Sequence, residues 1–436
     1  MRSRMLGVAA LAIGVAVTLS ACSGGSVTGN SGDSGGKTQI TVWHNYTGDQ
    51  ATEAKKLIQE YNDSQDKVEV TAQYAAQSDQ FDAKLINALK NDTGPNMVLG
   101  DSTPQKIGQV VETGKVVPLD DYLSDSDSSI TTKSFTEGML ATGKFEGKTY
   151  TLPTDIGDYA VVYNKQMFKE AGITDTPTTW AELQADAKKL TKGTTQYGMY
   201  LPIGTGEWPV FTYQSMLWSA GGEFMNEDNT KVEFNSDAGV KALKAWTDML
   251  EDGSAYPQSL MTSTSNGGTP ALTAKKAAMA ITGAYDLGTL DEALGKENVG
   301  VFALPGIEQN AANLGTNNSY LLDGSKAEKD ASWDFMQWWL SPKVEAKWDI
   351  ATGLLPANTA TNDDATWKKH LADNPRITAF ADELAYAKSR PSIVAYGEVS
   401  EALSKELEKA MLLKESPEDA LATAEKKAQA VLDAAD

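Results

Sequence analysis

Several polar and aromatic side chains stand in short loops that directly follow expected β-strands, where a ligand could reach them. Asn45, Tyr46 and Thr47 follow the first expected strand, and Asp101 follows the third. Carboxylate and amide oxygens accept hydrogen bonds from hydroxyl groups, and an aromatic ring offers an apolar face to the C–H groups of a sugar. These residue types predict binding of a hydroxylated ligand, although each loop could instead cap the helix that follows it.

Two further candidates lie in loops that precede helices. Gln77 stands before the second expected helix, and Trp208 lies in the glycine-rich turn Gly204–Pro209. A tryptophan in such a turn is less tied to a core than one at helical spacing, so we expect Trp208 to be a stacking platform. Trp218 lies on an apolar helix and is expected in the core. Helical spacing predicts the same for Trp246, Trp333, Trp338, Trp339 and Trp348.

Cysteine and histidine are too scarce to support most catalytic or metal-binding chemistry. The single cysteine excludes a disulfide framework and a cysteine-based zinc or iron–sulfur site, and the two histidines, His44 and His370, have no partners at metal-ligand spacing. The net charge of −21 disfavours nucleic acid and anionic membrane surfaces as partners. We therefore expect no metal, no cofactor, no catalytic residue and no nucleic-acid partner.

The length and the order of the elements predict an α/β protein. A chain of 436 residues, 41% hydrophobic and 22% charged, suggests two or three soluble domains. The first part alternates strands and helices, which implies a parallel sheet with helices on both faces. The expected strands are Gln39–Trp43, 68–72 and Asn96–Leu99, and the expected helices are 51–61 and 81–89.

The same alternation returns in the second part of the chain, so we expect two α/β lobes with a ligand cleft between them. The strands expected there are Tyr159–Tyr163, Tyr197–Leu201 and Ala277–Ile281. One helix is expected over Gly239–Leu250, and others are expected to begin near Thr179 and at Ser416. Ser325, with its capping-box partner Glu328, marks the start of a further helix. No repeat with a period of 20–50 residues is present.

The N-terminal segment is typical of a secretory signal. Residues 1–21 carry two arginines and an apolar run, Leu6–Leu19, that is shorter than the roughly 20 residues of a membrane-spanning helix. The segment ends in Leu19-Ser20-Ala21-Cys22, which resembles the bacterial lipobox. We therefore expect a signal peptide over 1–21 and lipidation of Cys22; the alternative is an ordinary signal cut near Ala21.

A linker follows the expected lipidation site. Ten of the 16 residues over 22–37 are glycine or serine, which predicts a flexible lipoprotein linker. The protein should then be held by a lipid anchor on the extracellular face of the cell membrane.

Four segments, in this order, resemble the extracellular solute-binding proteins of ABC importers, in the large sugar-binding group that includes maltose-type and glycerol-phosphate-type binders. The sharpest is Leu152–Gly172 (LPTDIGDYAVVYNKQMFKEAG), followed by Pro177–Leu183 (PTTWAEL). The others are 277–285 (AAMAITGAY) and Ala331–Asn358, which contains Thr352-Gly353-Leu354-Leu355-Pro356. The resemblance covers nearly the whole chain after the linker.

The resemblance implies a two-lobed periplasmic-binding-protein-like fold (type II), with two parallel-sheet lobes joined by a hinge. Lobe 1 would comprise 38–152 and 306–345, and lobe 2 would comprise 153–305 and 346–436, with crossings near 152–158, 302–308 and 339–353. It also implies a carbohydrate ligand, an ABC importer permease as partner, and a monomer.

The resemblance adds site residues to those found from the loops. Asp155 and Asp158 would lie at the first crossing, and Asn317, beside Asn318, would follow the second. Tyr285 and Tyr396 match positions where the family places stacking aromatics, and Asp286 neighbours Tyr285. Asp155 and Asp158 could each bind ligand or order the hinge.

Three alternatives remain open to the expected carbohydrate, an oligosaccharide. Within the family, the ligand could be glycerol phosphate or another polyol. A secreted glycoside hydrolase would need a carboxylate pair, for which Asp101 with Asp155 could be imagined, but no catalytic motif supports it. A polysaccharide adhesin would expose aromatics on a flat face rather than in a cleft.

Overall fold

Two mixed β-sheets organise the chain. The five-stranded first sheet has the order β2 (Val68–Tyr74), β1 (Thr38–His44), β3 (Met97–Asp101), β12 (Thr316–Leu321) and β6 (Leu152–Ile156). The four-stranded second sheet has the order β10 (Val299–Phe302), β7 (Tyr159–Asn164), β9 (Ala277–Gly283) and β8 (Tyr197–Tyr200). The structure is a computed structural model that describes residues 36–76, 78–102, 106–262 and 265–435. The expected signal peptide, Cys22 and Gln77 lie outside these ranges. Of the expected linker, the ranges include only Gly36 and Lys37.

The helices follow the strands in the order that the sequence predicts. Before β6 the chain forms α1 (Gly48–Ser64), α2 (Ser78–Lys90), α3 (Ile107–Val111), α4 (Asp120–Ser124) and α5 (Glu137–Ala141). Between β7 and β10 it forms α6 (Lys165–Glu170), α7 (Trp180–Leu190), α8 (Glu207–Ser219), α9 (Asp237–Glu251), α10 (Gly268–Thr273) and α11 (Leu287–Leu294). After β12 it forms α12 (Lys326–Trp339), α13 (Pro342–Thr352), α14 (Ala365–Asp373), α15 (Thr378–Ala381), α16 (Tyr396–Met411) and α17 (Pro417–Ala435).

The parallel pairing expected for the first strands is confirmed: β1 pairs in parallel with β2 and with β3. Each sheet also contains antiparallel strands that come from distant parts of the chain. In the first sheet β12 runs antiparallel to β3 and β6, and in the second sheet β7 runs antiparallel to β9 and β10. The chain enters the first sheet again with β12, after it has formed the second sheet, whereas the four strands of the second sheet follow one another along the chain.

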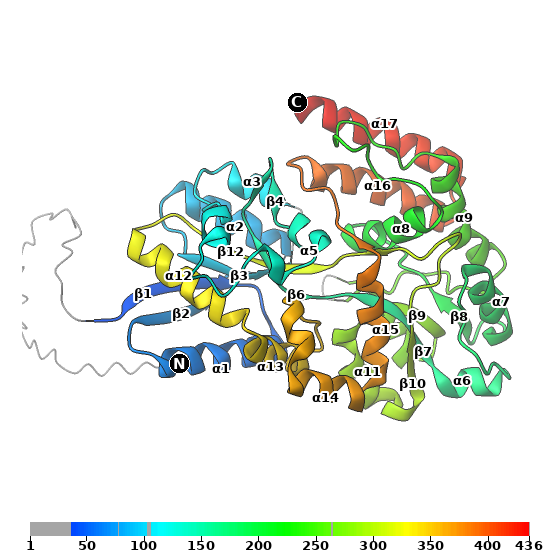
Figure 1. Cartoon of the computed structure of the whole chain (residues 1–436). Helices are drawn as coiled ribbons and strands as arrows, with labels where there is room; N and C mark the ends of the chain where they lie inside the picture. The colour runs from blue at the N-terminus through cyan, green and yellow to red at the C-terminus, as the bar shows by residue number, and fades with distance from the viewer. Residues whose placement is uncertain (1–35, 77, 103–105, 263–264, 436) are drawn as a thin grey trace, which may run out of the picture. The chain divides into compact units, whose positions relative to one another are not determined.

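The two sheets belong to two lobes of one folded unit that starts at Lys37. In Figure 1 the blue and cyan elements gather with the yellow α12 around the first sheet, and the green elements gather with α16 and α17 around the second. The boundaries expected at 152/153 and 345/346 fall inside β6 and α13. The helix α13 packs against α1, and Leu355 exchanges backbone hydrogen bonds with Ile156. The lobe boundaries stay a prediction.

Local sequence signals account for the ends of several helices. The capping box expected at Ser325 and Glu328 is confirmed, and a second one joins Thr179 to Glu182 at the start of α7.

The described helices include none that is both long enough and apolar enough to cross a bilayer.

Candidate functional site

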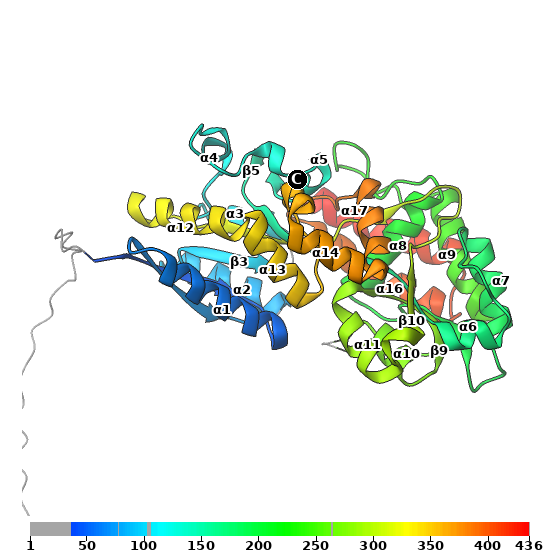
Figure 2. The ribbon, with the colours of Figure 1, turned by 60° about the horizontal axis from the view of Figure 1, so that its bottom comes forward.

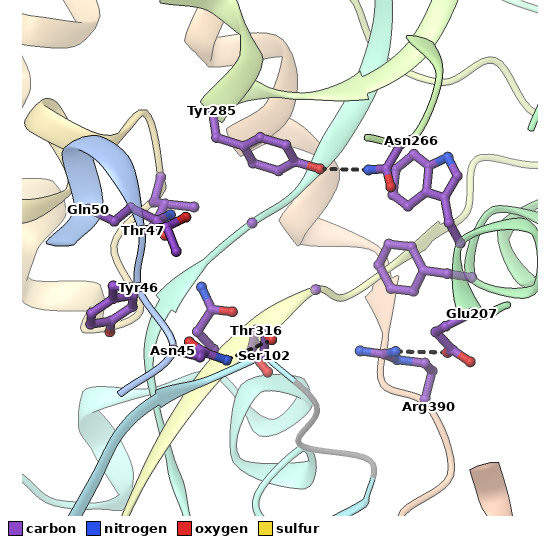
Figure 3. A pocket seen from close by; sticks show the side chains of 16 residues that line it. Asn45, Tyr46, Thr47, Gln50, Ser102, Glu207, Asn266, Tyr285, Thr316 and Arg390 are labelled. Atoms are coloured by element: carbon purple, nitrogen blue, oxygen red, sulfur yellow. Dashed lines mark hydrogen bonds and ion pairs between the residues drawn. The ribbon is translucent and has the colours of Figure 1, made fainter. Parts of the chain in front are cut away.

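A cleft of about 550 Å³ is lined by residues from both lobes. Its walls combine amides, hydroxyls, four aromatic rings and one ion pair (Figure 3). The first-lobe side supplies Asn45, Tyr46, Thr47, Gln50, Ser102, Thr316 and Asn317. The second-lobe side supplies Glu207, Trp208, Phe211, Asn266, Tyr285 and Arg390, and the remaining wall is formed by Gly157, Gly315 and Leu354.

The loop between β1 and α1 brings three predicted residues, Asn45–Thr47, to this wall. The Asn45 amide Nδ2 donates to Ser102 Oγ at 3.1 Å, which joins the loop after β1 to the end of β3. Tyr46 is buried and its ring centroid lies 4.7 Å from that of Trp348. Tyr46 therefore anchors the loop in the core and contributes only an edge to the cleft.

Tyr46 can occupy this position only because Gly100 has no side chain. Gly100 adopts φ +68°, and a Cβ there would lie 1.8 Å from the Tyr46 hydroxyl oxygen. Positive φ and a close approach both favour glycine. The end of β3 is therefore shaped to receive the Tyr46 ring.

The aromatic wall comes from α8 and from the end of β9. Trp208 is half-buried, and its ring stacks on Phe211 with centroids 5.8 Å apart. Tyr285 is 37% exposed, and its hydroxyl accepts a hydrogen bond from Asn266 Nδ2 at 3.2 Å (Figure 3). These rings provide the apolar surfaces that a sugar ring requires.

The ion pair in the wall joins Arg390 to Glu207. Arg390 Nη1 lies 2.8 Å from Glu207 Oε1, and the guanidinium carbon lies 4.7 Å from the centroid of the Phe211 ring. Tyr396 donates its hydroxyl proton to the same Glu207 oxygen at 2.8 Å. Ser400 donates its hydroxyl proton to the other carboxylate oxygen, Oε2. Glu207 is thereby held by three donors, and the positive charge of Arg390 is balanced where it meets the cleft.

Sequence reasoning missed seven polar or aromatic side chains of the cleft, although two signals point to Phe211 and Arg390; the seven are Gln50, Ser102, Glu207, Phe211, Asn266, Thr316 and Arg390. Beyond the first four residues the chain has only two arginines, Arg376 and Arg390. Because arginine is so scarce here, each of the two is a candidate for a specific interaction. Phe211 follows Trp208 by three residues on α8, a spacing that places two side chains on one face of a helix. No comparable sequence signal marks Glu207.

The predicted residues divide into those that line the cleft and those that lie behind it. Asn45, Tyr46, Thr47, Trp208, Tyr285 and Asn317 line it, whereas Asp101, Asp155, Asp158 and Tyr396 are buried and do not. Asp101 accepts a hydrogen bond from the Tyr320 hydroxyl at 3.1 Å. Asp286 lies beside Tyr285 but faces a neighbouring hollow.

The buried carboxylates support residues of the wall instead. Asp155 accepts hydrogen bonds from Trp348 Nε1 at 2.9 Å and from the amide of Asn317, which lines the cleft. Burial raises the pKa of Asp155 to about 7, although both hydrogen bonds oppose the shift. Asp158 accepts a hydrogen bond from the backbone N–H of Tyr159, and burial raises the pKa of Asp158 to about 8.

Two more carboxylates on α13 surround Asp155. Glu345 accepts from the backbone N–H groups of Ala357 and Asn358, each at 2.9 Å, and burial raises its pKa to about 8. Burial, followed by repulsion from Glu345 and Asp155, raises the pKa of Asp349 well above its ordinary value. Like charges in one buried site disfavour full ionisation, so this cluster retains protons near neutral pH.

Among the residues that the structure describes, the cleft lining contains one carboxylate, that of Glu207, and no cluster of metal ligands. Among the described residues, no group of three histidine, cysteine or acidic side chains could hold a metal ion. Asp101 and Asp155, the pair considered for glycoside hydrolysis, are both buried outside the cleft wall. Neither carboxylate is placed to act on a glycosidic bond in the cleft.

Known proteins are similar to this chain in fold, and in sequence over most of its length. A binding protein of Brucella abortus is 29% identical over 353 residues, which are 80% of this chain and 83% of the relative. The sn-glycerol-3-phosphate-binding periplasmic protein of Yersinia pestis is 23% identical over 424 residues, 91% of this chain and 92% of the relative. The crystal structure of the cyclic alpha-maltosyl-1,6-maltose binding protein from Arthrobacter globiformis matches with a TM-score of 0.80 at 29% identity, covering 91% of this chain and 99% of that one.

The structural likeness confirms the two-lobed α/β fold expected from the sequence. The family model for bacterial extracellular solute-binding proteins matches residues 56–375. Because this match spans most of the chain, the protein belongs to the bacterial extracellular solute-binding proteins.

Proposed function

We propose that the protein captures a carbohydrate, specifically an oligosaccharide, outside the cell and delivers it to the permease of an ABC importer. The observation that carries the proposal is the aromatic wall of Trp208, Phe211 and Tyr285, which faces the amides of Asn45 and Asn317 across one cleft. A sugar ring needs both an apolar platform and hydroxyl partners. The Arthrobacter globiformis structure, whose name states a maltosyl-maltose ligand, supports the same class.

The volume and the charge of the cleft also favour an oligosaccharide. A volume of about 550 Å³ lies within the range of about 300–1,000 Å³ typical of small-molecule sites. Among the described residues of the wall, the one positively charged side chain is that of Arg390, which is paired with Glu207. A neutral ligand can use the guanidinium N–H groups as donors without breaking that pair.

Glycerol phosphate is the second candidate, and Arg390 is the observation that favours it. A guanidinium binds phosphate oxygens well, and the Yersinia pestis relative is named for sn-glycerol 3-phosphate. Such a ligand would have to compete with Glu207 for Arg390, since the two groups are 2.8 Å apart. This competition weakens the case for a phosphate ligand.

A binding screen of the purified full chain tests both candidates. The panel contains linear α-1,4-glucans from maltose to maltohexaose, the cyclic tetrasaccharide cyclic maltosyl-maltose, and sn-glycerol 3-phosphate. A ligand that binds only the folded state raises its stability by roughly 2.7 kcal/mol at a hundredfold excess over the dissociation constant. We expect a rise in melting temperature with at least one oligosaccharide, which is recovered uncut; a rise only with glycerol phosphate would reverse the order of the candidates.

We also propose that Cys22 carries a lipid that holds the protein at the outer face of the cell membrane. The lipobox-like segment before Cys22 and the glycine- and serine-rich stretch after it support this proposal. Cys22→Ala should release the protein from the membrane fraction while ligand binding persists. Retention of that variant in membranes would refute the anchor without affecting the proposed ligand.

A further inference from the structure

A second hollow lies beside the cleft, at the carboxyl end of β9. This side pocket of about 430 Å³ is lined by Thr269 and Thr273 of α10, by Asp286, and by Thr289 of α11. The helices α10 and α11 lie side by side next to β9 (Figure 2). The carboxyl end of a strand and the helices beside it are common places for a ligand in α/β folds.

The side pocket and the cleft share one wall, made by Tyr285 and Asn266. Both residues line both hollows, and the hydrogen bond between them joins Asn266 Nδ2 to the Tyr285 hydroxyl (Figure 3). Gly283 leaves room for the ring, because a Cβ there would lie 2.1 Å from Tyr285 Cε1. Tyr285 and its hydrogen-bond partner Asn266 therefore separate two adjoining spaces.

The lining of the side pocket matches neutral hydroxyl groups. The carboxylate of Asp286 already accepts the hydroxyl proton of Thr282, and burial raises its pKa. Thr273 donates its hydroxyl proton to the backbone oxygen of Thr269 at 2.9 Å, which leaves its oxygen as an acceptor. Among the described residues that line the side pocket there is no lysine, arginine or histidine. A phosphate or carboxylate would meet Asp286 without a counter-charge, whereas a sugar hydroxyl can donate to it.

We infer that the side pocket is a second carbohydrate subsite, in which a neutral sugar ring binds on the far side of Tyr285 from the ring in the cleft. This inference rests on the proposed function and narrows it. The ligand class becomes a neutral oligosaccharide with enough units to pass Tyr285. A glycerol phosphate is too small to fill both hollows and would leave the side pocket without a ligand group.

Two substitutions in the side pocket test the inference by calorimetric titration of the full chain. Asp286→Asn removes the charged acceptor, and Thr289→Val removes an exposed hydroxyl with little change in shape. The matched control is Thr366→Val, because Thr366 is also exposed and also lies in the first turn of a helix, α14. The titrants are maltose to maltohexaose and cyclic maltosyl-maltose, and the melting temperature of each unliganded variant checks folding.

In the wild type we expect affinity to rise with the number of sugar units once the chain can pass Tyr285. Each of the two variants should lower the affinity for the longer ligands by about 2- to 10-fold, the effect of one lost hydrogen bond. The affinity for the shortest ligand that binds should not change, and Thr366→Val should behave as the wild type. The step in affinity with length is the readout that a general loss of folding would not produce.

The outcomes separate this inference from the proposed function. Oligosaccharide binding that is the same for all lengths, or that both variants leave unaltered at every length, would overturn the second subsite and leave the proposed function standing. An equal loss of affinity for short and long ligands would also overturn the second subsite. The substitutions would then disturb the cleft itself and not a separate site for an additional sugar ring. Failure of every oligosaccharide to bind the wild type would remove the proposed function and this inference with it.

Discussion

Glu207 Oε1 lies 2.8 Å from Arg390 Nη1 and accepts the hydroxyl proton of Tyr396 at the same distance. These two contacts join α8, the segment before α16 and the start of α16 at the wall of the cleft. Arg390 is only 9% exposed along its side chain and also covers the Phe211 ring. The ion pair thus lies directly against Phe211 of the aromatic wall.

Replacing Glu207 should therefore damage both stability and binding. Glu207→Gln leaves the mostly buried Arg390 charge without its partner, which should lower the free energy of unfolding by about 1–3 kcal/mol. Denaturation with urea measures this change. The same variant frees Arg390 for an anion, so any affinity for sn-glycerol 3-phosphate should rise relative to that for oligosaccharides. Unchanged stability would show that the pair contributes little.

Tyr285 should contribute strongly to affinity and little to folding. Tyr285→Ala removes an aromatic surface that is 37% exposed, so we expect a loss of about 1–3 kcal/mol of binding free energy. Tyr74→Ala is the matched control, because Tyr74 is 49% exposed and lies on β2, outside the cleft lining. Equal affinities of the two variants would mean that the ligand does not contact Tyr285.

Gly100 should be far less tolerant of a side chain than Gly114. Both residues have positive φ, +68° and +71°, but a Cβ at Gly100 would meet the Tyr46 hydroxyl at 1.8 Å, whereas nothing lies within 4 Å of one at Gly114. Gly114→Ala should cost about 1 kcal/mol for its backbone conformation alone. Gly100→Ala should cost about 1–3 kcal/mol more from the clash and should weaken binding by displacing the loop after β1. Thermal unfolding and titration of the two variants compare these effects.

Stability should fall as the pH rises through the neutral range. Burial raises the pKa of Asp155 to about 7 and that of Glu345 to about 8, whereas both groups have a pKa of about 4 in an unfolded chain. The folded state therefore holds protons that the unfolded state releases. The stabilisation that these protons give the folded state is complete below about pH 4 and is lost as the pH rises through about 8.

Removing one charge from the cluster should flatten this dependence. Neither carboxylate oxygen of Asp349 has a hydrogen-bond partner among the described residues. Asp349→Asn should raise the free energy of unfolding by about 1–3 kcal/mol at pH 8.5 and change it less at pH 5. The exposed Asp63→Asn serves as the control. Parallel curves of stability against pH for the wild type and Asp349→Asn would contradict the proton-sharing cluster.

The sequence predicted much of the fold because its signals are local. Alternating apolar residues marked β1 and β2, continuous apolar runs marked β7 and β9, and Ser325 with Glu328 marked the start of α12. A strand period or a capping box involves residues that are neighbours along the chain. Such patterns can be found without knowing which strands pair. The antiparallel strands β6 and β12 could not be placed in this way, because their partners are distant in sequence.

The sequence by itself determined which residue types could bind a sugar and that Asn45 and Trp208 stand outside regular apolar patterns, whereas Tyr285 was predicted from the resemblance to the family. Only the tertiary structure decided which of them share a wall. Asp155, Asp158 and Tyr396 have the same chemistry as cleft residues, yet packing buries them behind it. Glu207 and Arg390 are 183 residues apart and meet in one ion pair. The exposure and the partners of a side chain depend on long-range packing, which local patterns do not encode.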